Sequence, residues 1–114
     1  MALVCYHGET PHRIDQDRAS EIVKVMLDST NRKIITCIKD DAKNIIQIQK
    51  ETNIPTSTIY RRLCTLNNKR LIILSGDINS DGRKFLKYKS KIRKVVTIVE
   101  DDVLDVKIFS NLKD

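Results

Sequence analysis

Aromatic residues and long apolar runs are scarce in this chain of 114 residues. There is no Trp, and two Phe with three Tyr leave the aliphatic residues, mostly Ile, Leu and Val, to fill a core. No apolar run approaches the roughly 18 residues that a membrane-spanning helix needs. Residues 2–6 are too short for the apolar region of a signal peptide, and no basic residue precedes them. With 40% hydrophobic and 32% charged residues, the composition predicts one globular domain that does not interact with a membrane.

Cysteine is also sparse, and its pattern bears on compartment and on metal binding. The three cysteines are odd in number and widely spaced, which fits a reducing compartment better than a disulfide framework. We therefore expect a cytoplasmic protein. Cys5, His7 and His12 lie near one another, but their spacing matches no zinc pattern and no CxxC supplies a fourth ligand. Neither a metal site nor a cofactor is expected.

The residue patterns that support catalysis are missing as well. Both histidines fall within the first 12 residues, and no Ser/His/Asp arrangement is legible. The three glycines do not form a phosphate-cradling loop. Cys37 has no candidate base and is interpreted as a small buried residue. We expect that the chain is not an enzyme.

The positive charge is concentrated in one part of the chain. Residues 50–94 carry twelve Lys or Arg and three Asp or Glu, a net charge of +9. Residues 1–49 carry seven of each sign, and residues 95–114 carry two basic and five acidic residues, a net charge of −3. Such a segment favours a polyanionic partner. A solvated lysine-rich surface is the simpler alternative.

The first half of the chain predicts an arm followed by helices. In residues 1–19, Gly8, Pro11 and the polar run HRIDQD indicate an irregular arm, which is either mobile or a strand at a subunit contact. Residues 21–27 have enough apolar side chains for a short helix. Asp28, Ser29 or Thr30 then caps a second helix, whose inward face carries three isoleucines (Ile34, Ile35 and Ile38).

Residues 41–68 predict two further helices that meet at a tight turn. Asp40 and Asp41 offer N-cap side chains for the first, and Asn53 suits the left-handed conformation just past its end. Pro55 fits the first turn of the second helix. That helix places Ile59, Leu63 and Leu66 on one face. The opposite face carries polar and basic side chains: Ser57, Arg61, Cys64 and Asn68, flanked by Thr58 and Tyr60. An inward apolar stripe backed by hydrogen-bond donors is typical of the recognition helix of a helix-turn-helix, although an ordinary helical hairpin gives a similar pattern.

Two β-hairpins are predicted after the helices. Residues 71–74 are a short apolar strand, 76–82 (GDINSDG) a turn, and 83–89 a strand that alternates basic and apolar residues. A basic hairpin directly after a recognition helix predicts a wing. Residues 95–99 and 103–109 predict a second hairpin around the acidic turn 100–102, which extends the core or forms a subunit contact. The predicted fold class is α+β, a winged helix-turn-helix with a three-helix core, a β-hairpin wing and an additional C-terminal β-hairpin. The expected divisions are the arm 1–19, the winged helix domain 20–90 and the hairpin extension 91–114.

Three stretches carry a family resemblance: TNRKIITCIK, NIIQIQKETNIPTSTIYRRLCTLNNKRLI and GDINSDGRKFLKY. Across roughly residues 20–90 the chain resembles the ArsR-like winged-helix regulators, particularly archaeal members, with IPTSTIYRRL as the most specific part. The resemblance implies a dimeric, sequence-specific transcription regulator. Metal-sensing members have a paired-cysteine motif on the recognition helix, where this chain has Cys64 alone, so metal sensing is not implied. The C-terminal dimerisation helix of typical members is also missing.

The expected function is therefore sequence-specific binding of double-stranded DNA by a homodimer that regulates transcription. Recognition helix 56–68 would enter the major groove, and wing 76–84 would lie on the backbone or minor groove. Base contacts are expected from Ser57, Thr58, Tyr60 and Arg61, and backbone contacts from Thr56, Arg62, Lys69, Arg83 and Lys84. The alternative is a winged-helix protein-interaction module within a transcription or RNA-processing assembly.

Overall fold

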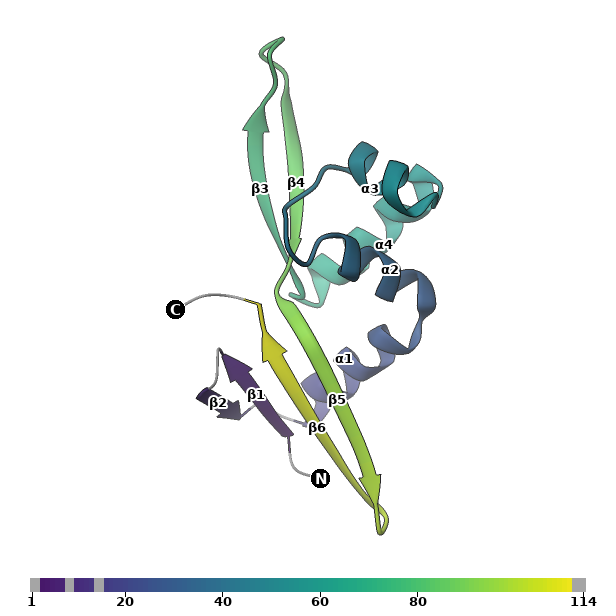
Figure 1. The fold of residues 1–114 in the computed structure, drawn as a ribbon, viewed down its shortest axis with the longest axis vertical. Coiled ribbons are helices and arrows are strands. Elements are labelled where there is room, and N and C mark those ends of the chain that lie inside the picture. The colour runs from purple at the N-terminus through teal and green to yellow at the C-terminus, as the bar shows by residue number, and fades with distance from the viewer. Residues whose placement is uncertain (1–2, 8–9, 14–15, 112–114) are drawn as a thin grey trace.

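The computed structural model describes residues 3–7, 10–13 and 16–111 as an elongated α+β structure with extents of 56 × 30 × 20 Å (Figure 1). These described residues include four helices and six strands. One β-hairpin projects at each end of the long axis, and the helices lie between them to one side (Figure 1). None of the described helices has the length and apolar character needed to cross a bilayer.

Helices α1 (Gln16–Leu27) and α2 (Ser29–Cys37) are separated by one residue, Asp28. The Asp28 carboxylate accepts a hydrogen bond of 3.0 Å from the Asn31 amide, so it is the N-cap of α2, as expected. Helix α1 begins five residues before the predicted helix, and this added part buries Ala19 in the core. The extra turns replace part of the expected arm.

Helices α3 (Ile45–Thr52) and α4 (Thr56–Asn68) meet at a three-residue turn. The prediction that Asp40 or Asp41 caps α3 is wrong. Asn44 is the N-cap, and its side chain and that of Gln47 bond each other's backbone amides, both at 2.8 Å. Asn53 ends α3 in the predicted left-handed conformation, with φ of 61°. Pro55 is the N-cap of α4, one position earlier than expected.

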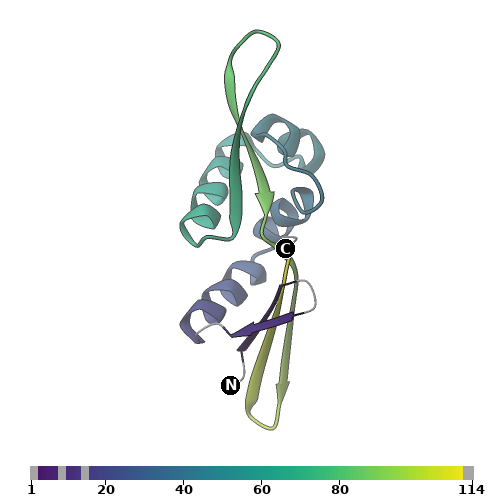
Figure 2. The ribbon, with the colours of Figure 1, turned by 90° about the vertical axis from the view of Figure 1, so that its left-hand side faces the viewer.

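Strands β3 (Ile72–Ile78) and β4 (Lys84–Ser90) form an antiparallel hairpin that projects past the helices (Figure 2). β3 extends four residues beyond the predicted strand, so the connecting loop is 79–83, shorter than expected. The Asn79 side chain accepts hydrogen bonds from the Asp81 and Arg83 amides, and Gly82 adopts φ of 78°. At the base of the hairpin, Lys43 and Tyr88 exchange two backbone hydrogen bonds of 3.0 and 2.8 Å.

The second sheet has the strand order β2-β1-β6-β5. Its strands are β1 (Leu3–His7), β2 (Thr10–Arg13), β5 (Ile92–Glu100) and β6 (Val103–Ser110). The prediction of an irregular arm is therefore wrong for β1 and β2. The alternative, a strand, is what the structure shows, but β1 pairs in parallel with β6 of the same chain. The predicted C-terminal hairpin is present, and Asp101 and Asp102, both at positive φ, make its turn.

One aliphatic core joins the helices to both hairpins. Residues from all four helices and from β3 to β6 are buried in it: Ala19, Ile22, Val25, Ile34, Ile35, Ile38, Ile48, Ile59, Leu63, Leu66, Leu71, Ile72, Tyr88, Ile92, Val106 and Ile108. The β5–β6 hairpin thus extends the core, as predicted. The strand predicted to be buried at 71–74 is buried only at its start, since Leu74 is 38% exposed.

Candidate nucleic-acid interface

Helix α4 has one buried and one exposed face. Ile59, Leu63 and Leu66 are at most 1% exposed. The opposite side is exposed and consists of Ser57, Tyr60, Arg61, Cys64 and Asn68; we call it the outer face of α4. Tyr60 is 57% exposed, which is unusual for an aromatic ring in a core-forming helix. No acidic residue occurs in α4, so this face presents donors, hydroxyls and a cation without a competing carboxylate.

The N-terminal end of α4 is open. Pro55 makes no side-chain cap, and the first helical backbone bond runs from the Ile59 amide to the Pro55 carbonyl at 3.0 Å. The amides of Thr56, Ser57 and Thr58 lie before that bond and have no helical carbonyl to pair with. Free amides and the positive end of the helix dipole favour an anion here.

Two adjacent arginines of α4 have different surroundings. Arg61 is exposed, and its guanidinium has no hydrogen-bond or ion-pair partner in the part of the chain that the structure describes. Arg62 instead pairs with Asp28 at 2.9 Å and donates to the Asn31 side chain at 3.4 Å. The backbone amide of Asn31, and then Arg62, hold the pKa of Asp28 below its usual range. The structure therefore directs Arg62 to the α1–α2 corner, away from the outer face where a backbone contact was expected.

The other predicted cations are spread over two places. Arg83 and Lys84 are exposed at the far end of the β3–β4 hairpin. Lys69 is half-buried at the C-cap of α4, where its carbonyl accepts a hydrogen bond from the Arg18 guanidinium. The structure thus gathers Thr56, Ser57, Thr58, Tyr60 and Arg61 on one helix, and places Arg83 and Lys84 on a separate projection.

The β3–β4 hairpin also exposes apolar side chains that the sequence interpretation did not single out. Ile78 is 62% and Leu86 49% exposed. Together with Phe85 and the stem of Lys84 they line a hollow of about 580 Å³. Leu86 pairs with Gly76, and Ile78 with Lys84, so Ile78, Lys84 and Leu86 share one face of the hairpin, whereas Phe85, which pairs with Asp77, is on the other. The alternation of strand residues could have indicated this face, had the strand been extended past Leu74.

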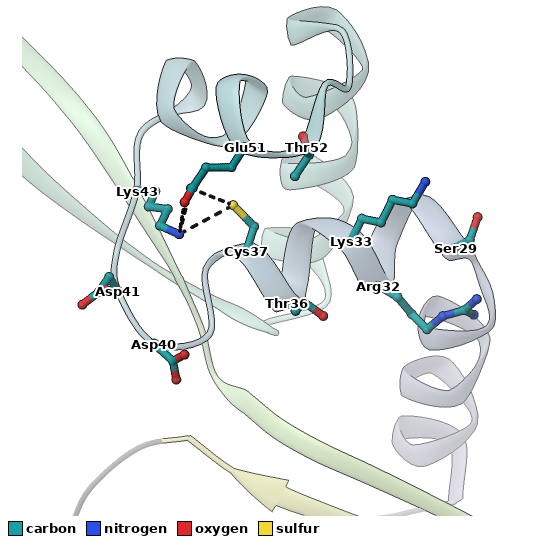
Figure 3. A pocket seen from close by; sticks show the side chains of 10 residues that line it. All are labelled: Ser29, Arg32, Lys33, Thr36, Cys37, Asp40, Asp41, Lys43, Glu51 and Thr52. Atoms are coloured by element: carbon teal, nitrogen blue, oxygen red, sulfur yellow. Dashed lines mark hydrogen bonds and ion pairs between the residues drawn. The ribbon is translucent and has the colours of Figure 1, made fainter.

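A second hollow, of about 750 Å³, lies between the end of α2, the following loop and the end of α3 (Figure 3). At its wall the Lys43 ammonium lies 2.8 Å from the Glu51 carboxylate, and the Cys37 thiol donates to the same carboxylate at 3.2 Å (Figure 3). The Lys43 backbone is also the one bridged to Tyr88. Lys43 therefore ties α2, α3 and β4 together, which its sequence neighbours do not reveal.

The protonation of this cluster argues against an activated thiol. Burial raises the pKa of Cys37, and the hydrogen bond to Glu51 raises it further, against the opposing effect of Lys43. The hydrogen bond from Lys43 lowers the pKa of Glu51 and raises that of Lys43. At neutral pH the set is thus a neutral thiol beside an ion pair. A nucleophilic cysteine needs the opposite shift.

Cys5 and His7 lie in β1 and His12 lies in β2, where the backbone of Cys5 pairs with that of His12. The structure does not describe the side chains of these three residues. No cluster of metal-ligating residues occurs among the residues that are described. The absence of a metal site stays a prediction for these three residues.

Comparisons of the chain with protein-family models, with curated proteins and with solved structures gave no match.

Proposed function

We propose that the chain is a sequence-specific DNA-binding regulator of transcription with a winged helix-turn-helix fold. In this proposal α3 and α4 are the helix-turn-helix, and the β3–β4 hairpin is the wing. The observation that carries it is the outer face of α4, where Arg61 has no partner among the described residues while neighbouring Arg62 is held by Asp28. An unpaired cation beside hydroxyls and an exposed Tyr, on a helix without acidic residues, is suited to base edges in a major groove.

The order of the elements supports the same fold. After α2, Lys43 forms a single β-bridge with Tyr88 at the base of the β3–β4 pair. Helices α3 and α4 follow this bridge, and the hairpin comes directly after α4. Two helices and a following two-stranded hairpin, with the helices and the base of the hairpin in one core, are compatible with a winged helix. The resemblance to ArsR-like regulators remains part of the proposal.

The residues take two roles. Ser57, Tyr60 and Arg61, with Thr58 at the edge of the face, would contact bases, and Arg61 would prefer the O6 and N7 atoms of guanine. The backbone would be held by Thr56 with the open amides of α4, and by Lys69, Arg83 and Lys84. Arg62 is reassigned as a stabilising residue. We propose a homodimer, acting in the cytoplasm, where the free thiols Cys37 and Cys64 would remain reduced.

A titration with DNA at several salt concentrations tests the proposal. The protein is added to labelled duplex from the region upstream of its own gene and to a random duplex of equal length, and binding is followed by fluorescence anisotropy. A dimer that neutralises about eight phosphates should show a slope of log K against log salt near −7. The upstream duplex should bind more tightly than the random one. Absence of binding at about 50 mM salt would rule the proposal out, since non-specific contacts alone are strong there.

One observation favours a protein-interaction module instead. The exposed Ile78 and Leu86 on the β3–β4 hairpin give it an apolar side that phosphate contact does not need. In that case Ile78→Ser would abolish association with a protein partner and would not change the affinity for DNA. If the chain regulates transcription by binding DNA, Ile78→Ser should change affinity for duplex by less than about twofold, because the basic residues remain.

A further inference from the structure

Strand β5 is an edge strand whose middle, residues 95–99, lacks the features that normally protect an edge. In the sheet order β2-β1-β6-β5, β5 pairs with β6 on one side, and no described strand pairs with the other. Residues 95–99 (VVTIV) are β-branched throughout, with no charge, proline or glycine. Natural edges are usually short, charged or bulged. Here the bulge lies at the start of β5, between Ile92 and Lys94, and leaves residues 95–99 regular.

Apolar side chains lie uncovered on and around this edge. Val99 is 72% and Ile98 41% exposed on β5, and Leu27 at the end of α1 is 73% exposed. Between α1 and β5 there is a hollow of about 270 Å³, lined by Val23, Met26 and Leu27 of α1, by Arg32 of α2, and by Val95 and Thr97 of β5. A strand added beside β5 would cover this hollow. Its backbone would pair with β5, and its side chains would lie against α1.

The charges at the two ends of β5 indicate which strand that is. Arg93 and Lys94 begin the strand, and both lie over the Phe109 ring at 5.4 and 5.2 Å. Glu100 ends it, next to the turn residues Asp101 and Asp102. A basic start and an acidic end, around an uncharged middle, are complementary to the same strand running in the opposite direction.

We infer that the occupant is a second copy of this chain, bound through antiparallel pairing of β5 with β5 about a two-fold axis. Residues that pair directly must point to the same face of the sheet, so a two-fold axis perpendicular to the sheet passes midway between the two strands, at the level of a residue that pairs with its own copy. With the axis at the level of Thr97, Lys94 of each copy faces Glu100 of the other copy, so one such pair lies at each end of the paired segment. Both copies then keep α1 on the same face of one continuous sheet. This inference gives the homodimer of the proposed function an interface, and it does not require DNA.

Charge reversal tests the register without DNA. Sedimentation of the full chain should give a dimer, and Lys94→Glu should raise its dissociation constant about tenfold or more, because like charges then meet at both ends of the pair. Glu100→Lys alone should do the same. The double variant Lys94→Glu with Glu100→Lys should restore the dimer, since the charges are complementary again. Lys84→Glu, on the other hairpin, is the control and should leave dimerisation unchanged.

A crosslink tests the position of the axis. In a chain whose three natural cysteines are replaced by serine, Thr97→Cys should form a covalent dimer on oxidation, because directly opposed residues have Cβ atoms about 5 Å apart. Ser75→Cys, which is exposed on β3, should not. A protein that is still monomeric at about 100 µM would overturn the inference, because this concentration is well above a dimer dissociation constant of about 1 µM. A dimer or larger species that is indifferent to Lys94→Glu and to Thr97→Cys oxidation would overturn it too. If dimerisation holds and DNA binding fails, only the proposed function falls.

Discussion

The two β-hairpins at the ends of the molecule differ in how much of each is buried, although the sequence predicts both (Figure 1). The β5–β6 hairpin lies beside α1 and contributes Ile92, Val106 and Ile108 to the core. In the β3–β4 hairpin every residue from Leu74 to Lys84 is exposed. The first hairpin is therefore part of what holds the fold together. The second, beyond its base at Ile72 and Tyr88, adds surface and little stability.

The ends of the two hairpins also differ in charge. The end of β3–β4 carries Arg83 and Lys84 together with Asp81, an excess of one positive charge, whereas Glu100, Asp101 and Asp102 form the end of β5–β6. A phosphate backbone would be repelled by the second end and not by the first. The contrast is what the proposed function predicts, in which only the β3–β4 end lies on DNA.

The largest expected effect concerns the buried hairpin. Ile108→Ala removes three carbons from a side chain that is 3% exposed, and it should lower the free energy of unfolding by about 2–5 kcal/mol. Leu86→Ala, in the other hairpin and 49% exposed, should cost less than about 1 kcal/mol. Urea denaturation followed by circular dichroism measures both. Equal losses would mean that the β3–β4 hairpin packs on something and is not free surface.

Arg61 should have the next largest effect, on binding alone. Arg61→Ala should weaken the specific duplex by roughly 1–3 kcal/mol and flatten the preference at one base position. The melting temperature should stay unchanged, because the Arg61 guanidinium has no described partner to lose. Competition titrations with single-base variants of the site measure the preference. Equal weakening of specific and random duplexes, with a shallower salt slope, would show that Arg61 contacts phosphate.

The neighbouring Arg62 should show the opposite behaviour. Arg62→Ala leaves Asp28 without its ion pair and the buried Asn31 side chain with one hydrogen bond fewer. We expect a small loss in the free energy of unfolding, since the pair is more than one-third exposed and solvent screens it. Base preference should be unaffected. If base preference changes and thermal stability does not, the assignments of the two arginines must be exchanged.

Helix positions were predictable from the sequence because periodicity and end signals act locally. Ile59, Leu63 and Leu66 are buried as their spacing predicted, and Asn53 ends α3 as predicted. The N-cap of α3 was misassigned, because Asp40 and Asn44 are both competent caps. The choice between them depends on Lys43, whose backbone is held by Tyr88, 45 residues further on. A pairing at that range leaves no local signal.

The pairing of β1 with β6 could not be predicted from the sequence either. Nothing in residues 3–7 indicates that β1 lies beside β6, because parallel pairing depends on where the rest of the chain leaves an open edge. The candidate site shows the same division. Exposure of Ser57, Tyr60 and Arg61 followed from the helical period alone, whereas the pairing of Arg62 with Asp28 did not, since it required knowing how α4 crosses the α1–α2 corner.

The smallest expected effect separates the two hairpins by charge. Lys84→Ala should weaken binding to all duplexes alike and make the slope of log K against log salt shallower by about one unit for each phosphate that the protein no longer neutralises. The matched control is Lys107→Ala, which removes one lysine from the β5–β6 hairpin. Because this hairpin ends in three acidic residues, it should lie away from the phosphates. The slope of log K against log salt for Lys107→Ala should therefore match that of the unmodified protein. Both variants change net charge by the same amount, so overall charge cannot explain a difference between them. If the two slopes fall equally, the affinity comes from net charge alone, and the β3–β4 hairpin has no special position on the DNA.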